Sequence, residues 1–465
     1  MTRRRLLFEA GGGIGGLALS QLLAGDHPTG HPTGHPVGPH FAPRAKAVIS
    51  LFMMGGVSHV DTFDRKPMLE KYAGQPLSGK GDVVVRQGHP GPLMPSPFAF
   101  QRHGQSGLEV SELFPRVGAR ADQLALIRSV VSKSNDHVQA AYGLSSGVIR
   151  MGHPSLGSWV TYGLGSESRD LPGFVVIYDH RGGPFGGPAN WSAGFMPAAY
   201  QGTVFRSAAD PIFDLRPAAG VSTEEQRARL ALLGKLNSLD AANHASDTEL
   251  AARIESYELA FRMQSTAPEA VDISAESPAT RKLYGMDEAV TEPFGRQCLM
   301  ARRMVERGVR FVQLYHGGLG NQNTDTWDAH EDVRSNHTKH AAEVDTPIAG
   351  LLDDLKARGL LDSTLVIWQG EFGRMPISQR GLGRDHNPGA MSIWMAGAKI
   401  RGGQVIGSTD EFGYKAEEQP VSVHDLHATI LHLMGLDHTR LTFRQSGRDM
   451  RLTDVYGEVI PQVVA

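Results

Sequence analysis

The sequence has 465 residues, of which 40% are hydrophobic and 20% charged, so we expect a soluble globular protein with one large domain or two. Its formal net charge of -3 at pH 7 gives no electrostatic reason to expect nucleic acid or an anionic membrane as a partner. Cys298 is the only cysteine, which excludes an intramolecular disulfide and a cysteine-rich zinc site.

Residues 1–25 have the pattern of an export signal. Arg3, Arg4 and Arg5 precede a short, weakly apolar segment and then small residues, as in secretory signals. The arginine pair before a Gly-rich middle resembles the twin-arginine type; the alternative is an ordinary basic N-terminus. No later apolar run approaches the ~20 residues that a transmembrane helix needs. We therefore expect a protein exported to the periplasm or the extracellular space, by the twin-arginine route.

Residues 26–44 contain a Pro/Gly/His repeat that reads HPTGHPTGHPVGPH. Such a composition cannot build a core, so we interpret it as a linker, with weak metal binding as the alternative. An α/β domain is predicted over residues 45–460.

Inside that domain, residues 220–270 are polar and helical and are predicted to form an insertion that packs on the main domain. The apolar stripe of this insertion consists of Leu230, Leu232, Leu233 and Leu236.

Short apolar runs that end at glycines or polar turns predict the strands of a largely parallel sheet. These runs cover residues 47–54, 124–131, 174–178, 310–315, 363–368 and 391–396. Helical spacing predicts helices from His137 to a stop at Gly147, over residues 293–307 and over residues 344–355, and a short helical piece is expected within residues 108–120. Alternating strands and helices predict an α/β fold with right-handed crossovers.

Ligand-type side chains follow the predicted strands. Asp328, His330, Glu371, Asp385 and His386 are concentrated between residues 324 and 386, and Glu371 stands where the strand over residues 363–368 ends. Sites of open α/β sheets assemble at the carboxyl ends of strands, and mixed nitrogen and oxygen ligands suit zinc, manganese or related ions. The sequence therefore predicts a metal site on an α/β scaffold.

Three further strand ends carry candidate residues. His59, Asp61 and Asp64 follow the first strand, where a helix cap or a turn is the alternative explanation. His316 ends the strand over residues 310–315. His137 begins a helix after the strand over residues 124–131, and such helix N-termini bind oxyanions, although an ordinary connection capped by the preceding aspartate is also possible.

Five motifs together resemble the alkaline phosphatase/sulfatase superfamily and, within it, the uncharacterised domain family numbered 1501. They read GGVSHVDTFDRKP, WDAH, GEFGR, GRDH and VHDLHATIL, and they span about residue 45 to 460. The resemblance implies a three-layer sandwich whose central, mostly parallel sheet holds metal ions at the carboxyl ends of its strands.

The resemblance also implies roles for individual residues. One or two divalent ions (Zn, Mn or Ca) are expected on Asp61, Asp328, His330, Glu371 and His386, with Asp385 beside the last histidine. Phe372 stands where the superfamily has a histidine, which removes one expected ligand. Arg374 or Arg384 is expected to clamp the anion through paired N–H groups.

His137 occupies the position at which the superfamily carries a Ser, Thr or Cys nucleophile, and Ser134 lies close by. Histidine can act as a nucleophile, a ligand or a general acid, and the sequence does not choose among these roles.

The function implied by the resemblance is a secreted, metal-dependent hydrolase of sulfate or phosphate esters, with sulfated polysaccharides among the expected substrates. The alternative is a non-catalytic protein of the same fold that retains the metal and binds a partner, which the missing nucleophile and Phe372 favour.

Overall fold

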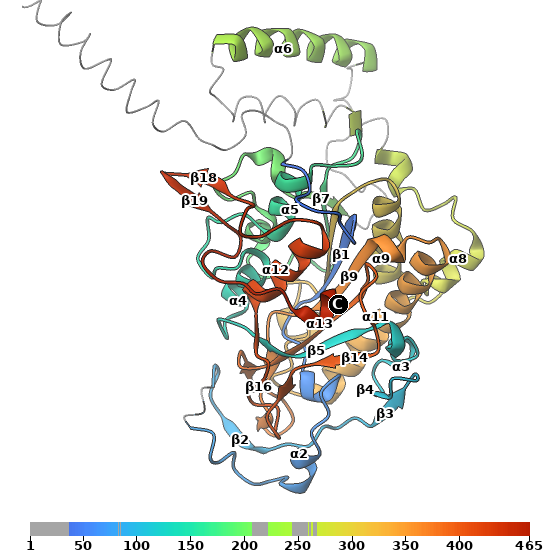
Figure 1. Ribbon diagram of the computed structural model, residues 1–465. Helices are drawn as coiled ribbons and strands as arrows, with labels where there is room; N and C mark the ends of the chain where they lie inside the picture. The colour runs from blue at the N-terminus through green and yellow to red at the C-terminus, as the bar shows by residue number, and fades with distance from the viewer. Residues whose placement is uncertain are drawn as a thin grey trace, which may run out of the picture.

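The computed structural model describes residues 37–81, 83, 85–206, 222–243, 259, 262–263 and 267–465. The predicted export signal and the linker as far as residue 36 lie outside the described residues. In the described part, a central sheet lies between two layers of helices (Figure 1).

Within the described residues, the central sheet has nine strands in the order β14-β5-β13-β9-β1-β8-β6-β7, with β17 beside β5. Neighbouring strands run parallel except where β13 pairs with β5 and β9. The strands are β1 (Ala47–Met53), β5 (Ala125–Val131), β6 (Phe174–Tyr178), β7 (Thr203–Arg206), β8 (Phe311–His316), β9 (Thr364–Gln369), β13 (Met391–Gly397), β14 (Gln404–Ile406) and β17 (Val421–Ser422).

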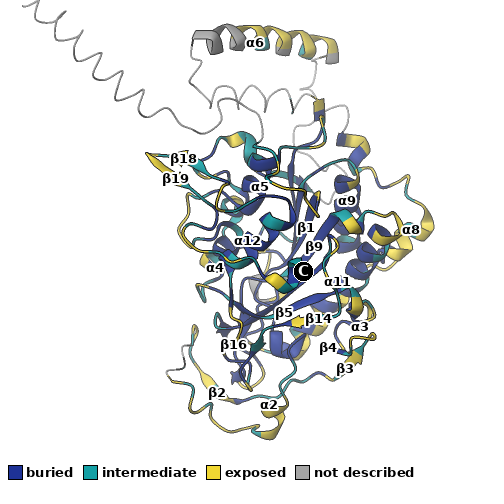
Figure 2. Ribbon diagram, viewed as in Figure 1, coloured by how far each residue is buried: buried dark blue, intermediate teal, exposed yellow. Residues whose placement is uncertain are grey.

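The apolar runs form strands because both faces of the sheet are covered. Every residue of β1 is buried. Ile49 and Leu51 contribute to the hydrophobic core on one face, whereas Val48 and Phe52 contribute to the core on the other. A strand buried on both faces has no polar alternation, which is why β1 is a continuous apolar run. Figure 2 shows the central strands as buried.

Helices cover the two faces of the sheet as separate layers. One layer contains α3 (Pro115–Gly118), α9 (Glu292–Glu306) and α11 (Val333–Ala357), and the other contains α4 (His137–Ser146), α5 (Leu156–Leu164) and α12 (Val423–Leu433). Further α-helices in the described residues are α2 (Pro67–Lys71), α6 (Thr223–Asn243), α8 (Pro278–Leu283), α10 (Gln322–Asp325) and α13 (Pro461–Val464). The predicted three-layer α/β fold with a mostly parallel sheet is confirmed.

Small two-stranded sheets lie outside the central sheet. They pair β2 (Pro90–Leu93) with β11 (Ile377–Gln379), β3 (Phe100–His103) with β4 (Leu108–Ser111), β10 (Gly373–Arg374) with β12 (His386–Asn387), β15 (Ser408–Thr409) with β16 (Ala416–Glu418), and β18 (Phe443–Gln445) with β19 (Arg448–Met450). The pairing of β10 with β12 places Arg374 opposite His386.

The short helical piece expected within residues 108–120 is α3, and the strand β4 precedes it in the same segment. One predicted helix differs in the structure. The helix predicted over residues 344–355 begins at Val333, because the carboxylate of Asp332 accepts hydrogen bonds from the backbone N–H groups of Arg334 and Ser335 and so caps the helix.

The insertion predicted over residues 220–270 is described mainly as α6. Its leucines Leu232, Leu233 and Leu236 are 60%, 50% and 53% exposed, so the predicted packing of this stripe on the main domain is wrong for these residues. Figure 2 shows α6 as largely exposed.

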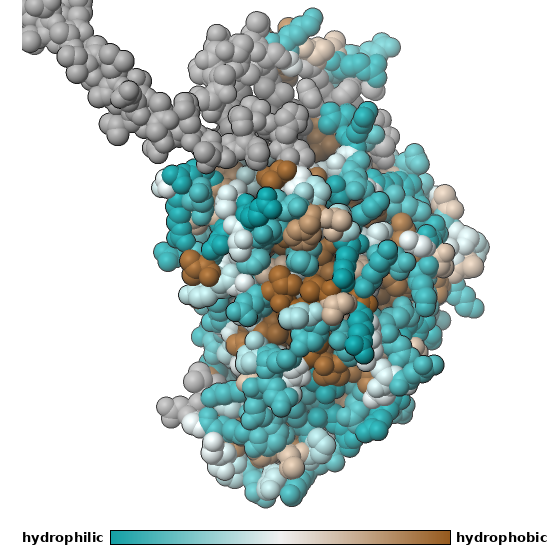
Figure 3. All heavy atoms as spheres, viewed as in Figure 1, coloured by the Kyte–Doolittle hydropathy of each residue, from teal (hydrophilic) through white to brown (hydrophobic). Residues whose placement is uncertain are grey.

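Figure 3 shows the viewed face of the molecule as mostly hydrophilic, with apolar residues gathered near its centre. None of the described helices combines the length and apolar character that membrane crossing requires.

Candidate metal centre

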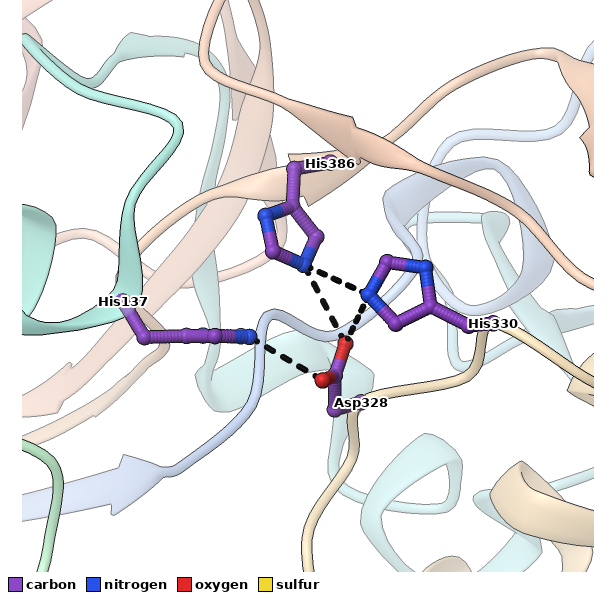
Figure 4. Close-up of side chains that lie close together, drawn as sticks. All are labelled: His137, Asp328, His330 and His386. Atoms are coloured by element: carbon purple, nitrogen blue, oxygen red, sulfur yellow. Dashed lines mark hydrogen bonds and ion pairs between the residues drawn. The ribbon is translucent and has the colours of Figure 1, made fainter. Parts of the chain in front are cut away.

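Four side chains from three separate chain segments meet at the carboxyl edge of the sheet. His137 is the first residue of α4, Asp328 and His330 lie between α10 and α11, and His386 is on β12. One ligand-type atom from each of the four lies within 4.8 Å of the others. We call these four residues the Asp328 cluster, because the three imidazoles point toward the carboxylate of Asp328 (Figure 4).

The distances within the Asp328 cluster are short. Asp328 Oδ1 lies 2.8 Å from His330 Nε2 and 3.2 Å from His386 Nε2, and the two Nε2 atoms are 2.9 Å apart. Asp328 Oδ2 lies 3.2 Å from His137 Nε2. All four side chains are buried, and the two oxygens of one carboxylate thus serve three imidazoles.

Each imidazole is held from its far side by a hydrogen-bond acceptor. His137 Nδ1 donates to Glu371 Oε1 at 2.7 Å, and His330 Nδ1 donates to Gln379 Oε1 at 2.5 Å. His386 Nδ1 donates to the backbone carbonyl of Asn135 at 2.7 Å. With the proton on Nδ1, each neutral ring presents a lone pair on Nε2 toward Asp328. An acceptor behind a histidine is the arrangement that orients metal-ligating imidazoles.

The Asp328 cluster fits a metal ion. Two Nε2 lone pairs face each other and a carboxylate oxygen at about 3 Å, an arrangement that repels unless a positive charge lies among them. His137 Nε2 is buried and makes no well-aligned hydrogen bond. Imidazole nitrogens and one carboxylate form a donor set that suits zinc and manganese.

The side chain of His137 is fixed by aromatic rings as well as by Glu371. Its ring stacks on Phe185 at 4.2 Å between centroids and lies 5.0 Å from Phe372. Burial disfavours the charged imidazole, but the carboxylates of Asp328 and Glu371 outweigh burial and raise the pKa of His137 to about 9. Without a metal, His137 therefore carries the positive charge that the two carboxylates require.

Asp328 stays ionised despite its burial. Burial opposes ionisation, but Arg374 and the three histidines hold the pKa of Asp328 well below its ordinary value. Burial and the charges of Arg374 and His137 lower the pKa of His386 to about 4, so His386 is neutral and able to ligate.

Arg374 holds the backbone around Asp328. Its guanidinium donates to Asp328 Oδ1 at 2.6 Å, to the carbonyl of Gly56 at 2.7 Å, to that of Arg384 at 3.0 Å and to that of Gly55. Arg374 is fully buried, and these partners occupy the N–H groups that the predicted anion clamp needs. The structure therefore places Arg374 as a support of Asp328.

The loop that follows β1 passes close to the Asp328 cluster, and its glycines allow this close approach. At Gly55 (φ +116°), a Cβ atom would lie 2.5 Å from the backbone nitrogen of Asp328; at Gly56 (φ +74°), it would lie 2.4 Å from the ring of Phe372. Neither backbone conformation suits other residues. The N–H of Gly55 donates to Glu371 Oε1 at 2.9 Å, so this loop reaches the site through its backbone.

The structure does not bring Asp61 into the Asp328 cluster. Both oxygens of Asp61 accept hydrogen bonds from Arg384, at 2.7 and 3.1 Å, and Ser58 donates to the same carboxylate at 2.5 Å. Both partners of this ion pair are fully buried. The predicted first-strand ligand and the second predicted anion clamp thus pair with each other.

The other predicted residues contribute no ligand-type atom to the Asp328 cluster. Glu371 bonds the Nδ1 of His137, the ring nitrogen that faces away from Asp328. Asp385 accepts from the backbone N–H of His386 through Oδ1, at 2.8 Å. His59 bonds the carbonyl of Gly413, and Asp64 forms ion pairs with Lys66 and Arg128.

A second group of titratable residues lies beside the first. Among the described residues, His316, His340 and Glu343 also bring ligand-type atoms within 4.8 Å of one another. Arg181 binds Glu343 through both carboxylate oxygens at 3.1 and 3.0 Å, and it also binds Asp179. We call these five residues the Glu343 cluster.

The tautomer of His316 argues against a metal in the Glu343 cluster. The indole N–H of Trp327 donates to His316 Nδ1 at 3.0 Å. An indole nitrogen only donates, so Nδ1 must accept and the proton of neutral His316 is on Nε2. That proton is directed to Glu343 Oε2 at 2.8 Å. His316 is therefore a proton donor here and not a free ligand.

Several supporting residues gave no usable sequence signal. Gln379 reaches His330 from β11, and no ligand-type pattern marks its position in the chain. His340 and Glu343 lie three residues apart on α11, a spacing that would have placed them on one face had the helix been extended to Val333.

The fold and the site define an α/β protein with a buried cluster of histidines and an aspartate that is able to hold a metal ion. The chain belongs to the family described as "Protein of unknown function (DUF1501)", which matches residues 45–464. The predicted family is thus confirmed. No curated protein matches the sequence.

Solved structures of similar fold include hydrolases. One is the PsFucS1 sulfatase from Pseudoalteromonas sp., with 13% identity, 90% of this chain and 71% of that chain covered, and a TM-score of 0.36. A second is the alkaline phosphatase of the Antarctic bacterium TAB5, with 10% identity, 85% of this chain and 99% of that chain covered, and a TM-score of 0.34. A third is the phosphonate monoester hydrolase of Agrobacterium radiobacter, with 11% identity, 85% of this chain and 74% of that chain covered, and a TM-score of 0.36. At such identities and TM-scores, none of these activities carries over to this chain.

Proposed function

We propose that the protein is an exported, metal-dependent hydrolase of sulfate or phosphate esters. The observation that supports it best is the convergence of three Nε2 atoms on one buried carboxylate, with every imidazole oriented from behind by an acceptor. Such preorganisation is characteristic of metal sites and is costly to maintain without an ion.

In this proposal, Asp328, His330, His386 and His137 hold one divalent ion. Three of the four donors are imidazole nitrogens, which favours zinc or manganese over calcium, an ion that prefers oxygen ligands. A bound ion would supply Lewis-acid polarisation of an ester oxygen and would lower the pKa of a water molecule.

The protein's own residues orient this site. Glu371 holds the Nδ1 proton of His137, so the Nε2 of that ring stays directed at Asp328. Arg374 occupies one lone pair of Asp328 Oδ1 and fixes the carboxylate between the imidazoles. Phe185 and Phe372 line His137 and keep water from its ring faces. Together these contacts fix the site geometry before a substrate arrives.

A second candidate function is a non-catalytic protein that retains the metal and binds an anionic partner. The supporting observation is the saturation of Arg374 and Arg384, whose N–H groups are bonded to buried protein oxygens and are not available to clamp an ester. His137 also offers an imidazole in place of a hydroxyl or thiol nucleophile.

The test begins with metal content, measured by mass spectrometry on the folded protein and on the Asp328→Ala/His386→Ala double variant. The proposal expects near-stoichiometric zinc or manganese in the wild type and loss of the metal in the double variant. Equal metal content in both proteins would refute the assigned ligands.

The loaded wild type is then assayed on a panel of sulfate and phosphate esters, with the double variant as the control. Turnover by the wild type that disappears in the double variant supports the hydrolase. A loaded wild type that turns over no ester supports the binding protein instead. Export is tested separately, by replacing Arg3 and Arg4 with lysine and measuring the location of the protein.

A further inference from the structure

Two exposed residues, Arg86 and Gln87, cross the Asp328 cluster on its solvent side. We call them the strap. The side chain of Gln87 reaches inward, and its Nε2 lies 2.9 Å from the Nε2 of His330. Because the Nδ1 of His330 donates to Gln379, its Nε2 must accept, and the Gln87 amide is the donor.

The strap is tied to all three segments that carry the Asp328 cluster. Its backbone N–H groups donate to Asp385 Oδ2, at 2.7 Å from Arg86 and 2.9 Å from Gln87, and Asp385 directly precedes His386. The guanidinium of Arg86 pairs with Asp136 at 2.8 Å, and Asp136 directly precedes His137. The third tie is the amide contact with His330.

These ties differ in strength. The Arg86–Asp136 pair is 47% and 34% exposed, so it is weak and readily broken. The two backbone hydrogen bonds to a carboxylate are charge-assisted and stronger. The strap is therefore held firmly at the His386 segment and loosely at the His137 segment, which makes the His137 side the end that opens.

The Gln87 amide occupies the lone pair that a metal ion would use. The Nε2 of His330 has a single lone pair, so it cannot bind an ion and accept the N–H of Gln87 at the same time. We propose that the strap is the gate of the metal centre: Gln87 competes with the ion for His330, and Arg86 holds the strap closed over the site. This inference rests on the metal centre of the proposed function, but not on ester hydrolysis.

The test uses the full-length protein, stripped with a chelator and mixed rapidly with Zn²⁺, and a second mixing step transfers the zinc to a fluorescent chelator. Arg86→Ala is expected to raise the rate of uptake and to lower the dissociation constant, each by about threefold, because the lost ion pair stabilises the closed strap in which Gln87 occupies the lone pair of His330. Gln87→Ala is expected to accelerate uptake and to lower the dissociation constant by about fivefold, because a competitor is removed.

Arg444→Ala is the matched control, since Arg444 forms an exposed ion pair with Asp449 at 3.2 Å on β18 and β19. Its rates should equal those of the wild type. Rates and affinity equal to those of the wild type in both strap variants would overturn the gate. A loss of zinc stoichiometry in these variants would also overturn it, because the strap would then be part of the site's structure.

The same experiment separates the two proposals. A wild type that binds no zinc overturns the metal centre and the gate with it. A wild type that binds zinc with gated kinetics but hydrolyses no ester supports the gate and contradicts the hydrolase.

Discussion

The Asp328 cluster and the Glu343 cluster contain the same kinds of side chains, but they differ in whether the Nε2 that faces the carboxylate carries a proton. In the Asp328 cluster, each Nδ1 donates to an acceptor, so each ring, when neutral, carries a lone pair on Nε2 into the site. In the Glu343 cluster, the indole of Trp327 donates to His316 Nδ1, so the Nε2 of His316 carries a proton. The partner of the remote nitrogen thus decides whether a histidine is a ligand or a donor.

The two clusters also differ in how their carboxylates are neutralised. Glu343 faces Arg181 through two hydrogen bonds, and His316 and His340 complete its shell. Asp328 receives one short contact from Arg374 and directs its other oxygen at His137. Arginine thus holds both oxygens of the first carboxylate but only one oxygen of the second.

The largest difference should appear when each carboxylate is made neutral. Asp328→Asn should weaken zinc binding by more than about 100-fold, because a ligand is lost. Glu343→Gln should leave zinc stoichiometry unchanged and lower the free energy of unfolding by about 2–3 kcal/mol, since Arg181 loses one of its two carboxylate partners and keeps only Asp179. Metal content and urea unfolding measure the two effects. Loss of zinc from Glu343→Gln would contradict the conclusion that only the Asp328 cluster binds the ion.

One group in each cluster, His137 and Glu343, should respond to opposite ends of the pH scale in the metal-free protein. The pKa of His137 is raised to about 9, so its contribution is complete below about pH 6.5 and is lost as the pH rises toward 9. That loss amounts to at most about 3 kcal/mol. The pKa of Glu343 is lowered, so its contribution is lost only as the pH falls below about 4.3.

Urea unfolding between pH 3 and pH 10 measures both limbs. His137→Gln should flatten the alkaline limb, and Glu343→Gln should reduce the acid limb, to which Asp328 also contributes. An alkaline limb that persists in His137→Gln would show that another group carries it.

A smaller effect is expected from the residue behind His330. Gln379→Leu removes the acceptor for His330 Nδ1 and should weaken zinc binding by about 10–100-fold. Gln379→Glu keeps an acceptor in place and should retain tight binding. Competition titration with a zinc chelator gives both affinities, and equal affinities in the two variants would show that the acceptor is not what orients His330.

The smallest effect is expected at Trp327. Trp327→Phe removes the N–H that fixes the His316 tautomer and should lower the free energy of unfolding by about 1–2 kcal/mol, with zinc affinity unchanged. Nitrogen NMR shifts of His316 report the tautomer directly. An unchanged tautomer in Trp327→Phe would mean that Glu343, rather than the indole, decides which nitrogen is protonated.

The fold was predictable because a strand buried on both faces is a continuous apolar run, as β1 is, and glycines mark its end. The start of α11 was not predictable from apolar spacing. Its first turns are rich in polar residues, and His337 and His340 are buried there against Trp327. Tertiary packing, rather than an apolar stripe, holds this part of the helix.

Ligand-type residues at the ends of strands were enough to predict part of the site. Asp328, His330 and His386 stand where ligands were expected, and the structure brings them together with His137. Asp61 fulfils the same criterion but meets Arg384, which lies more than 300 positions away and gives no local sign of the pairing. Gln87 and Gln379 act through amides whose partners are equally remote, so only the folded chain reveals them.

The order of the cluster residues along the chain has a consequence for biosynthesis. About 250 positions separate His137 from His386. A chain emerging from the ribosome completes its N-terminal part first, so the Asp328 cluster is not complete until β12 has been synthesised and paired with β10. Small zinc domains gain their fold from the ion. For the metal centre that we propose, the four ligands come together only once the sheet has formed, so metal acquisition would follow folding rather than drive it.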